Sequence, residues 1–214
     1  MKNPNNAVRL VAALGLALAV PAVLVAAPKA KKGLVSAAVP AGDVAAGRIK
    51  SESERCQECH GADGNGNGLD GKFARLAGQY PAYIAKQLQD FRSGARKHDY
   101  MMVMAKSLEE ADIADIAAYY GGLPAMRGEA AHADVETARQ LFTACAACHG
   151  AQGKGTGDAA FPVIGGQDAK YLRTQLLAWR SGERGNSPGG AMNEAAKNLT
   201  DAEIEVLARY ISGM

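Results

Sequence analysis

The sequence lacks an excess of charge of either sign. Its 214 residues include 24 lysines and arginines against 22 aspartates and glutamates. Two of the basic residues, Lys2 and Arg9, flank an N-terminal apolar segment, and 22 charges of each sign remain when these two are set aside. A near-neutral body argues against nucleic acid as a partner and against wholesale adhesion to anionic lipid. The function therefore has to reside in particular motifs.

Strand patterns are also missing, and cysteine is scarce. No segment shows the alternation of apolar and polar residues that is typical of a half-buried strand. The four cysteines all fall in two short stretches, "CQECH" (Cys56–His60) and "CAACH" (Cys145–His149). Two C-x-x-C pairs that are each followed at once by histidine fit covalent haem attachment far better than a disulfide framework.

The first 27 residues are an export segment. The chain carries no charge from Leu10 to Ala27. The length of this apolar run lies between that of a signal-peptide core, roughly 7 to 15 residues, and that of a membrane span, about 17 to 25 residues. We therefore expect residues 1–27 to be a signal peptide or a membrane anchor.

The rest of the chain is a tandem duplication of a unit of about 85 residues. The offset between the copies drifts from 88 to 91 residues, which short length changes in loops explain. The repeated pairs are Cys56–His60 with Cys145–His149, Phe73–Arg96 with Phe161–Arg184, and Leu108–Tyr120 with Leu199–Ile211. We predict a linker over 28–45, a first domain over 46–122, an interdomain linker over 123–134 and a second domain over 135–214.

Each copy is predicted to be all-α, with helices joined by long loops. Pro81 suits the first turn of a helix, Gly94 and Gly182 stand where helices would stop, and Thr200 with Glu203 could cap a start. Apolar residues at helical spacing are Ile84, Leu88 and Phe91, Leu172, Leu176 and Trp179, Ile113, Ile116 and Tyr119, and Ile204, Leu207 and Tyr210. A unit of this size needs help to complete a core, and a haem would supply it.

The C-x-x-C-H spacing matches the chemistry of haem. Two thiols at positions i and i+3 can each add across one vinyl group of the porphyrin, and the next residue, histidine, is then held beneath the iron as its proximal ligand. The alternatives are a zinc site and a redox disulfide pair. Zinc needs four ligands from each motif or one site shared by both, and a redox pair gains nothing from a following histidine.

The sixth iron position selects between electron transfer and reaction with small molecules. In the second copy, the candidate for the sixth ligand is Met192, seven residues before Leu199. Counting seven residues back from the matching Leu108 gives Met101 in the first copy. Alternatives for the first copy are Met104, one helical turn further along, and His98, which we expect to be a solvated loop residue.

With these motifs and the duplication in view, the chain resembles the cytochrome c4 family, di-haem class I cytochromes c of the bacterial periplasm. The resemblance covers about residue 45 to the C-terminus and includes "CHGADGNG" and "CHGAQGKG", "LAGQ" and "IGGQ", and "RSGAR" and "RSGER". It implies two tandem helical cytochrome c-type haem domains, two covalently bound haem c groups, and a periplasmic protein, soluble or tethered to the inner membrane. Upstream and downstream partners implied by the resemblance are a bc-type quinol–cytochrome c oxidoreductase and a haem-copper oxidase.

The resemblance also assigns roles to individual residues. It implies thioether attachment through Cys56, Cys59, Cys145 and Cys148, proximal ligation by His60 and His149, and distal ligation by Met101 and Met192. Three positions depart from the repeat. Pro162 has Ala74 as its counterpart, and Leu141 and Phe142 of the second leading helix have Glu52 and Ser53 as counterparts, so we expect a weaker, wetter first domain.

Two functions compete. The first is a two-centre electron carrier whose irons are both closed by methionine, with no catalytic residues. The second is a role in an enzyme, either as a di-haem peroxidase, which needs an open iron, or as the cytochrome subunit of a flavoprotein sulfide dehydrogenase or another redox enzyme.

Overall fold

Helices and connecting loops make up the part of the chain that the computed structural model describes, residues 41–66, 71–128 and 135–214, and no strand occurs there. The predicted all-α fold class is confirmed. The predicted leader over 1–27, most of the linker over 28–45 and part of the interdomain linker lie outside the described residues. Within the described ranges, no helix combines the length and apolarity needed to cross a bilayer.

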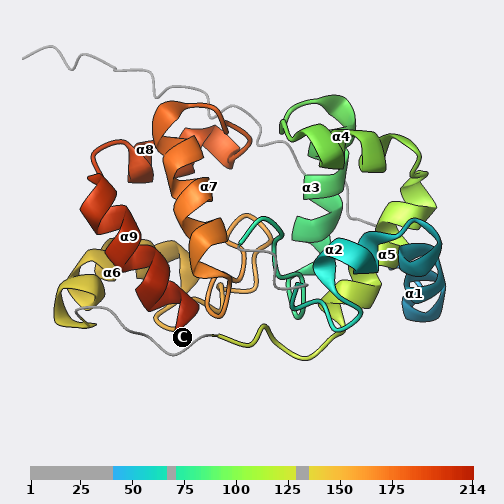
Figure 1. Cartoon of the computed structure of the whole chain (residues 1–214), viewed down its shortest axis with the longest axis horizontal. Helices are drawn as coiled ribbons and strands as arrows, with labels where there is room; N and C mark the ends of the chain where they lie inside the picture. The colour runs from blue at the N-terminus through green and yellow to red at the C-terminus, as the bar shows by residue number, and fades with distance from the viewer. Residues whose placement is uncertain (1–40, 67–70, 129–134) are drawn as a thin grey trace, which may run out of the picture. The chain divides into compact units, whose positions relative to one another are not determined.

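The first half of the chain, residues 41–128, is built around α5. Both α1 and α3 pack against this helix, and α4 packs against α3 (Figure 1). The helix α1 begins at Val44, inside the segment predicted to be a linker up to residue 45. The helices are α1 (Val44–Ser53), α2 (Cys56–His60), α3 (Pro81–Ser93), α4 (Asp99–Lys106) and α5 (Glu110–Gly121).

The second half, residues 135–214, repeats this packing around α9. Both α6 and α7 pack against α9, and α8 packs against α7 (Figure 1). A single helix, α6, takes the places of α1 and α2. The elements are α6 (Val135–His149), α7 (Ala169–Ser181), the 3₁₀ turn η1 (Pro188–Gly190), α8 (Ala191–Ala196) and α9 (Asp201–Ser212).

Local sequence signals set the helix ends as predicted. Pro81 is the first residue of α3, where its missing N–H breaks no hydrogen bond. Gly94 and Gly182 follow α3 and α7 with φ of 80° at both positions, in the left-handed region that glycine enters without strain. At the start of α9 the Thr200 hydroxyl accepts from the Glu203 N–H at 3.2 Å, while the Glu203 carboxylate accepts from the Thr200 N–H at 2.8 Å.

Each half buries its own apolar cluster. The predicted helical stripes supply most of the first cluster. They supply Leu172 and Leu207 to the second, where Leu176 and Tyr210 are only partly buried at the edge. The first cluster consists of Ile84, Ala85, Leu88, Leu108, Ile113, Ile116, Ala117, Tyr119 and Tyr120. The second consists of Phe142, Leu172, Leu207, Ala208 and Ile211.

The expectation of a weaker, wetter first domain stays a prediction. The structure shows that α1 docks through small residues rather than large apolar ones. Gly47 lies so close to α5 that a Cβ atom there would stand 1.9 Å from the Asp115 carbonyl oxygen. Ser51 is fully buried, and its hydroxyl shares a 2.8 Å hydrogen bond with the Tyr120 hydroxyl. A polar helix can therefore lie flat against the core with its buried polar atoms satisfied.

Replacing Gly47 with alanine tests this close approach. We expect Gly47→Ala to destabilise the first half by roughly 1–3 kcal/mol, because the backbone of α5 has to move away. Thermal unfolding of the haem-loaded protein, with hydrogen exchange resolved by helix, measures the loss at α1 and α5. The control is Gly185→Ala, since a Cβ atom at Gly185 meets nothing within 4 Å. Equal melting temperatures for the two variants would contradict the packing described here.

Candidate haem sites

Both C-x-x-C-H motifs sit at the end of a helix. Cys56 to His60 form α2, and Cys145 to His149 form the last turn of α6. Residues three apart on a helix share a face, so the two thiols of each motif lie on one side of the turn. Gly61 and Gly150 follow the histidines with φ of 76° and 78°, a conformation that glycine adopts readily. Each histidine is therefore the last helical residue before a sharp turn.

The helix that carries the motif is continuous in the second half and broken in the first. Arg55, directly before Cys56, has φ of 61° and is the one non-glycine residue with positive φ among those described. Its guanidinium pairs with the carboxylate of Glu58 at 2.7 Å. This break between α1 and α2 has no counterpart in α6, and no pattern in the sequence predicted it.

The glycine-rich loops after the motifs fold alike in both halves. The N–H of Gly66 donates to the His60 carbonyl at 2.8 Å, and the N–H of Gly155 donates to the His149 carbonyl at 2.7 Å. Further along each loop, the carbonyl of Gly64 accepts from two residues of "LAGQ", and that of Gly153 accepts from two residues of "IGGQ". The loops thereby bring the segments 73–79 and 161–167 back beside the histidines.

Each histidine is held by one ring nitrogen. The Nδ1 atom of His60 lies 2.8 Å from the Ala74 carbonyl oxygen, and that of His149 lies 2.9 Å from the Pro162 carbonyl oxygen. A carbonyl can only accept, so Nδ1 carries the proton and Nε2 keeps its lone pair. Burial lowers the pKa of both histidines, which keeps the imidazoles neutral. A neutral imidazole with a free Nε2 is the form that binds a metal ion.

The first half has Ala74 where the second half has Pro162, and this difference does not remove the hydrogen bond. Both positions contribute a backbone carbonyl, so the side chain at either site is not required for the contact. The sequence shows only that the two residues occupy matching positions, Ala74 14 residues after His60 and Pro162 13 residues after His149. Hydrogen bonding to a carbonyl could not be inferred from that spacing.

The thiols are unpaired and suited to neither alternative. All four cysteines are free. Burial raises the pKa of Cys56 and Cys145, whereas reactive redox cysteines have a lowered pKa. Among the described residues, no group of three or more His, Cys, Asp or Glu side chains is arranged to hold a metal ion, so the zinc alternative finds no site there.

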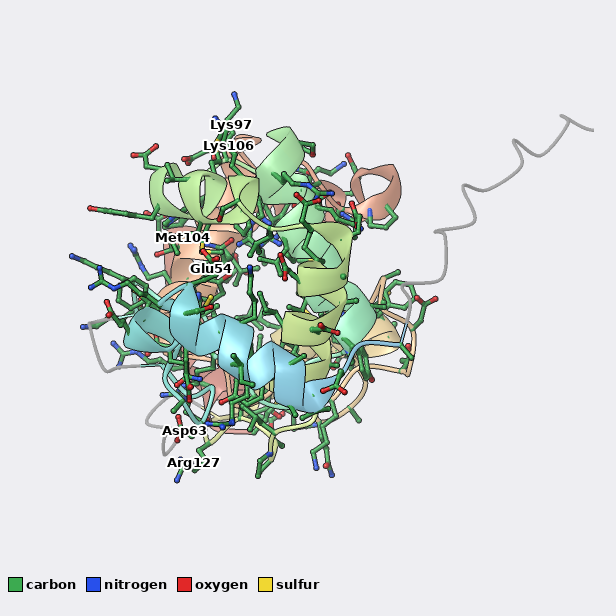
Figure 2. All side chains as sticks on the ribbon, turned by 90° about the vertical axis from the view of Figure 1, so that its right-hand side faces the viewer. Glu54, Asp63, Lys97, Met104, Lys106 and Arg127 are labelled. Carbon is green, nitrogen blue, oxygen red and sulfur yellow. The ribbon has the colours of Figure 1, made fainter. Side chains whose placement is uncertain are left out.

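The methionines predicted to be distal ligands, Met101 and Met192, lie on the short helices α4 and α8. Met101 packs against the same apolar cluster as Cys56, while Met102 and Met104 are partly buried on the same helix. Figure 2 shows Met104 on the side of α4 toward Glu54. His98 is exposed, but it is the N-cap of α4 rather than a free loop residue, because its Nδ1 accepts from the Met101 N–H at 3.4 Å.

Met192 is placed by contacts of the loop before it and of α7. Its N–H donates to the Ser187 hydroxyl at 3.1 Å. The neighbouring Asn193 side chain donates to the Trp179 and Arg184 carbonyls at 2.7 and 2.8 Å, which fixes α8 on the end of α7. The donor set of a haem c site is thus present in both halves: two thiols, a neutral imidazole and a thioether sulfur. These residues fit the group.

Residues shared by the two copies also form contacts between the halves. Gln79 of "LAGQ" donates to the Val163 carbonyl at 2.7 Å and accepts from the Val163 N–H at 3.0 Å. Gln167 of "IGGQ" does the same with Arg75, donating at 2.9 Å and accepting at 2.8 Å. In the sequence these glutamines stand out as part of the repeat and of the family resemblance, but their bonding to the other half is a tertiary feature that neither pattern predicts.

Two arginines of the repeat form a second network between the halves. Arg96 and Arg184, the last residues of "RSGAR" and "RSGER", are each 8% exposed. Arg96 donates to Gln87 in its own half and to Tyr171 and Gln175 in the other. Arg184 donates to Gln175 in its own half and to Tyr83 and Gln87 in the other. Each guanidinium also lies over an aromatic ring, 4.6 Å from that of Phe91 and 4.3 Å from that of Trp179.

Substitution of the methionines distinguishes the candidate distal ligands. A methionine–iron bond gives a near-infrared band in the oxidised protein, so we expect Met101→Ala and Met192→Ala each to remove about half of its intensity. Met104→Ala and Met102→Ala serve as controls and should leave the band intact. Loss of the band in Met104→Ala instead would transfer the assignment to that residue.

The reciprocal glutamines should couple the halves energetically. In Gln79→Leu/Gln167→Leu the backbone groups of Val163 and Arg75 lose their partners, at roughly 0.5–1.5 kcal/mol for each hydrogen bond. We expect a lower midpoint in guanidinium denaturation and separate transitions for the two halves. The control is Gln140→Leu, whose side chain contacts Glu136 within its own helix. Indistinguishable unfolding curves for the double variant and the control would contradict this coupling.

Comparison with known proteins identifies the family. The cytochrome c family model matches the chain twice, over residues 44–123 and 135–214. Cytochrome c4 of Thiocapsa roseopersicina is 36% identical over 192 residues, covering 85% of this chain and 98% of the relative. The thiosulfate dehydrogenase electron acceptor of Stutzerimonas stutzeri is 40% identical over 172 residues, covering 74% of this chain and 78% of the relative.

A solved structure shows the same fold. Reduced recombinant cytochrome c4 from Pseudomonas stutzeri superposes with a TM-score of 0.75 at 36% identity, covering 81% of this chain and all of that one. This chain has two tandem helical cytochrome c domains, each with its own C-x-x-C-H motif. The chain therefore belongs to the cytochrome c family, among the di-haem proteins related to cytochrome c4, and carries two covalently bound haem c groups.

Proposed function

We propose that this chain is a periplasmic two-centre electron carrier. The observation that carries the proposal is the repetition of one complete donor set in both halves. Each half supplies a neutral imidazole held at Nδ1 and a methionine on a short helix, so one histidine and one methionine could hold a haem iron in each half. An iron held in this way would leave no place for a substrate.

The residues of this chain would hold, orient and shield the cofactor. Cys56, Cys59, Cys145 and Cys148 would form the thioethers, His60 and His149 the proximal bonds, and Met101 and Met192 the distal bonds. Haem iron, when bound, supplies reversible one-electron chemistry. The buried clusters of α3 with α5 and of α7 with α9 exclude water, which limits the reorganisation that accompanies a change of charge.

Two comparisons suggest redox partners for the proposed carrier. The resemblance to cytochrome c4 favours a bc-type quinol–cytochrome c oxidoreductase as donor and a haem-copper oxidase as acceptor. The name of the Stutzerimonas stutzeri relative favours a second possibility, a redox enzyme as donor, because that relative is an electron acceptor of thiosulfate dehydrogenase. Under this second candidate, the chain serves an oxidising enzyme and passes the electrons onward.

Spectroscopy of the purified, exported protein tests the carrier. We expect the methionine–iron band at two equivalents per chain, unchanged by peroxide, and uptake of two electrons per chain in a reversible titration. Both irons are closed in this account, so carbon monoxide should not bind the reduced protein. An iron that binds carbon monoxide or reacts with peroxide would contradict the carrier and favour an enzymatic role.

Stopped-flow mixing separates the two candidate donors. The oxidised protein is mixed in one arm with a quinol–cytochrome c oxidoreductase and quinol, and in the other with thiosulfate dehydrogenase and thiosulfate. Fast reduction in the first arm alone supports the respiratory carrier. Fast reduction in the second arm alone supports the acceptor of an oxidising enzyme.

A further inference from the structure

Four exposed residues lie on α4 and in the chain just before it, and we call them the α4 row. Tyr100, Val103 and Lys106 stand three positions apart on α4, a spacing that places successive members close together on the helix surface, and Lys97 precedes the N-cap residue His98. Tyr100 is 77% exposed and Val103 is 68% exposed. The other exposed large apolar side chains in the described ranges are Val44, at 53%, and Ile49, at 60%, on α1. Along the sequence, the α4 row therefore has two large apolar residues flanked by one lysine on each side.

The two ammonium groups of the row have no carboxylate partner among the described residues. Figure 2 shows Lys97 and Lys106 near each other in this view on one side of α4, with Met104 and Glu54 on the other. The Glu54 carboxylate is already engaged, with Lys50 at 3.3 Å and with the Ser107 hydroxyl at 3.3 Å. Asp99 is the one carboxylate within α4, and it stands in the first turn, where the helix dipole favours it.

The equivalent row of the second half has a different character. At an offset of 91 residues the positions are held by Pro188, Ala191, Glu194 and Lys197. Alanine and glutamate replace the tyrosine and valine, and the Lys197 ammonium pairs with the Glu194 carboxylate. Both halves carry the same haem donors, so haem binding does not explain the difference between the rows.

We propose that the α4 row is the docking surface for a redox partner that presents an apolar patch rimmed by carboxylates. Two large exposed apolar side chains gain free energy when a partner covers them, and two unpaired ammonium groups select a partner with acidic groups at matching positions. This inference rests on the proposed electron-carrier function and deepens it.

Docking on the α4 row makes the first half the entry or exit point for electrons. The row lies on the helix that holds Met101, so a partner seated there stands next to the distal side of the first haem site. One electron crosses this contact in each docking event. The donor is oxidised and the acceptor reduced by the same amount, and no bond or proton is exchanged.

A chemically defined surface can stand in for the partner. The probe is a gold electrode coated with a mixed monolayer of carboxylate-terminated and methyl-terminated alkanethiols, which offers the haem-loaded protein both acidic and apolar groups. Voltammetry then gives an electron-transfer rate for each haem. Met101→His and Met192→His mark the waves of the first and second halves, because replacing methionine with histidine as the sixth ligand lowers the potential.

Charge substitutions test the ends of the row. We expect the faster wave to belong to the first half, and its rate to fall roughly tenfold in Lys97→Glu/Lys106→Glu at low ionic strength, with the difference fading at high salt. The matched control, Lys197→Glu in the second half, should leave this rate unchanged. A faster wave that belongs to the second half, or an equal loss in the control, would overturn the proposal.

Apolar substitutions test the centre of the row. Tyr100→Ser/Val103→Ser should slow transfer on the mixed monolayer but not on a purely carboxylate one. Val44→Ser/Ile49→Ser removes the two exposed apolar groups of α1, which are 53% and 60% exposed, and should change neither rate. An equal effect of both pairs would overturn the proposal.

Other occupants of the row give distinct results. Binding to phosphatidylserine vesicles that is lost in Tyr100→Ser/Val103→Ser, with unchanged electrode rates, would identify a membrane contact and overturn the proposal. A dimer in solution that dissociates in the same variant would identify a second copy of the chain and also overturn it. The absence of two reversible one-electron waves would instead contradict the proposed function itself, and the docking surface with it.

Discussion

The hydrogen bond from the Nδ1–H of each motif histidine to a backbone carbonyl is the interaction on which both sites depend. It fixes the tautomer, orients the ring and leaves Nε2 free, while burial keeps the imidazole neutral. The bond exists only because a glycine ends the helix and a glycine-rich loop returns the chain to the histidine. Helix end, loop and carbonyl therefore act as one unit, which explains why all three repeat in both copies.

The duplication serves two purposes at once. The C-x-x-C-H motifs and the methionine-bearing helices supply a site within each half. The segments "LAGQ" and "IGGQ" and the arginines of "RSGAR" and "RSGER" supply hydrogen bonds between the halves. Because each copy contributes the same groups, Gln79 bonds the backbone of Val163 in the second half and Gln167 bonds the backbone of Arg75 in the first. A repeated sequence is thus suited to build both its haem sites and its own interface.

Local patterns in the sequence predicted most of the fold and the candidate ligands. Helical spacing, Pro81, Gly94 and the Thr200 capping box depend on neighbours along the chain, and the structure confirms them. The close approach of Gly47 to α5, the buried Ser51–Tyr120 bond and the break at Arg55 depend on distant contacts or on backbone strain, which spacing does not encode. The assignment of Met101 over Met104 stays a prediction from the repeat register.

Docking on the α4 row, as proposed, would give the molecule a direction. The candidate donor sets of the two halves match, but Tyr100 and Val103, flanked in sequence by Lys97 and Lys106, have no equivalent pair at the matching positions of the second half. The whole account depends on haem being covalently attached at both motifs. An intact mass of the exported protein, measured under denaturing conditions, tests this most directly. We predict the mass of the chain plus two haem groups bound through four thioethers. A mass showing one haem or none, or cysteines joined as disulfides, would contradict it.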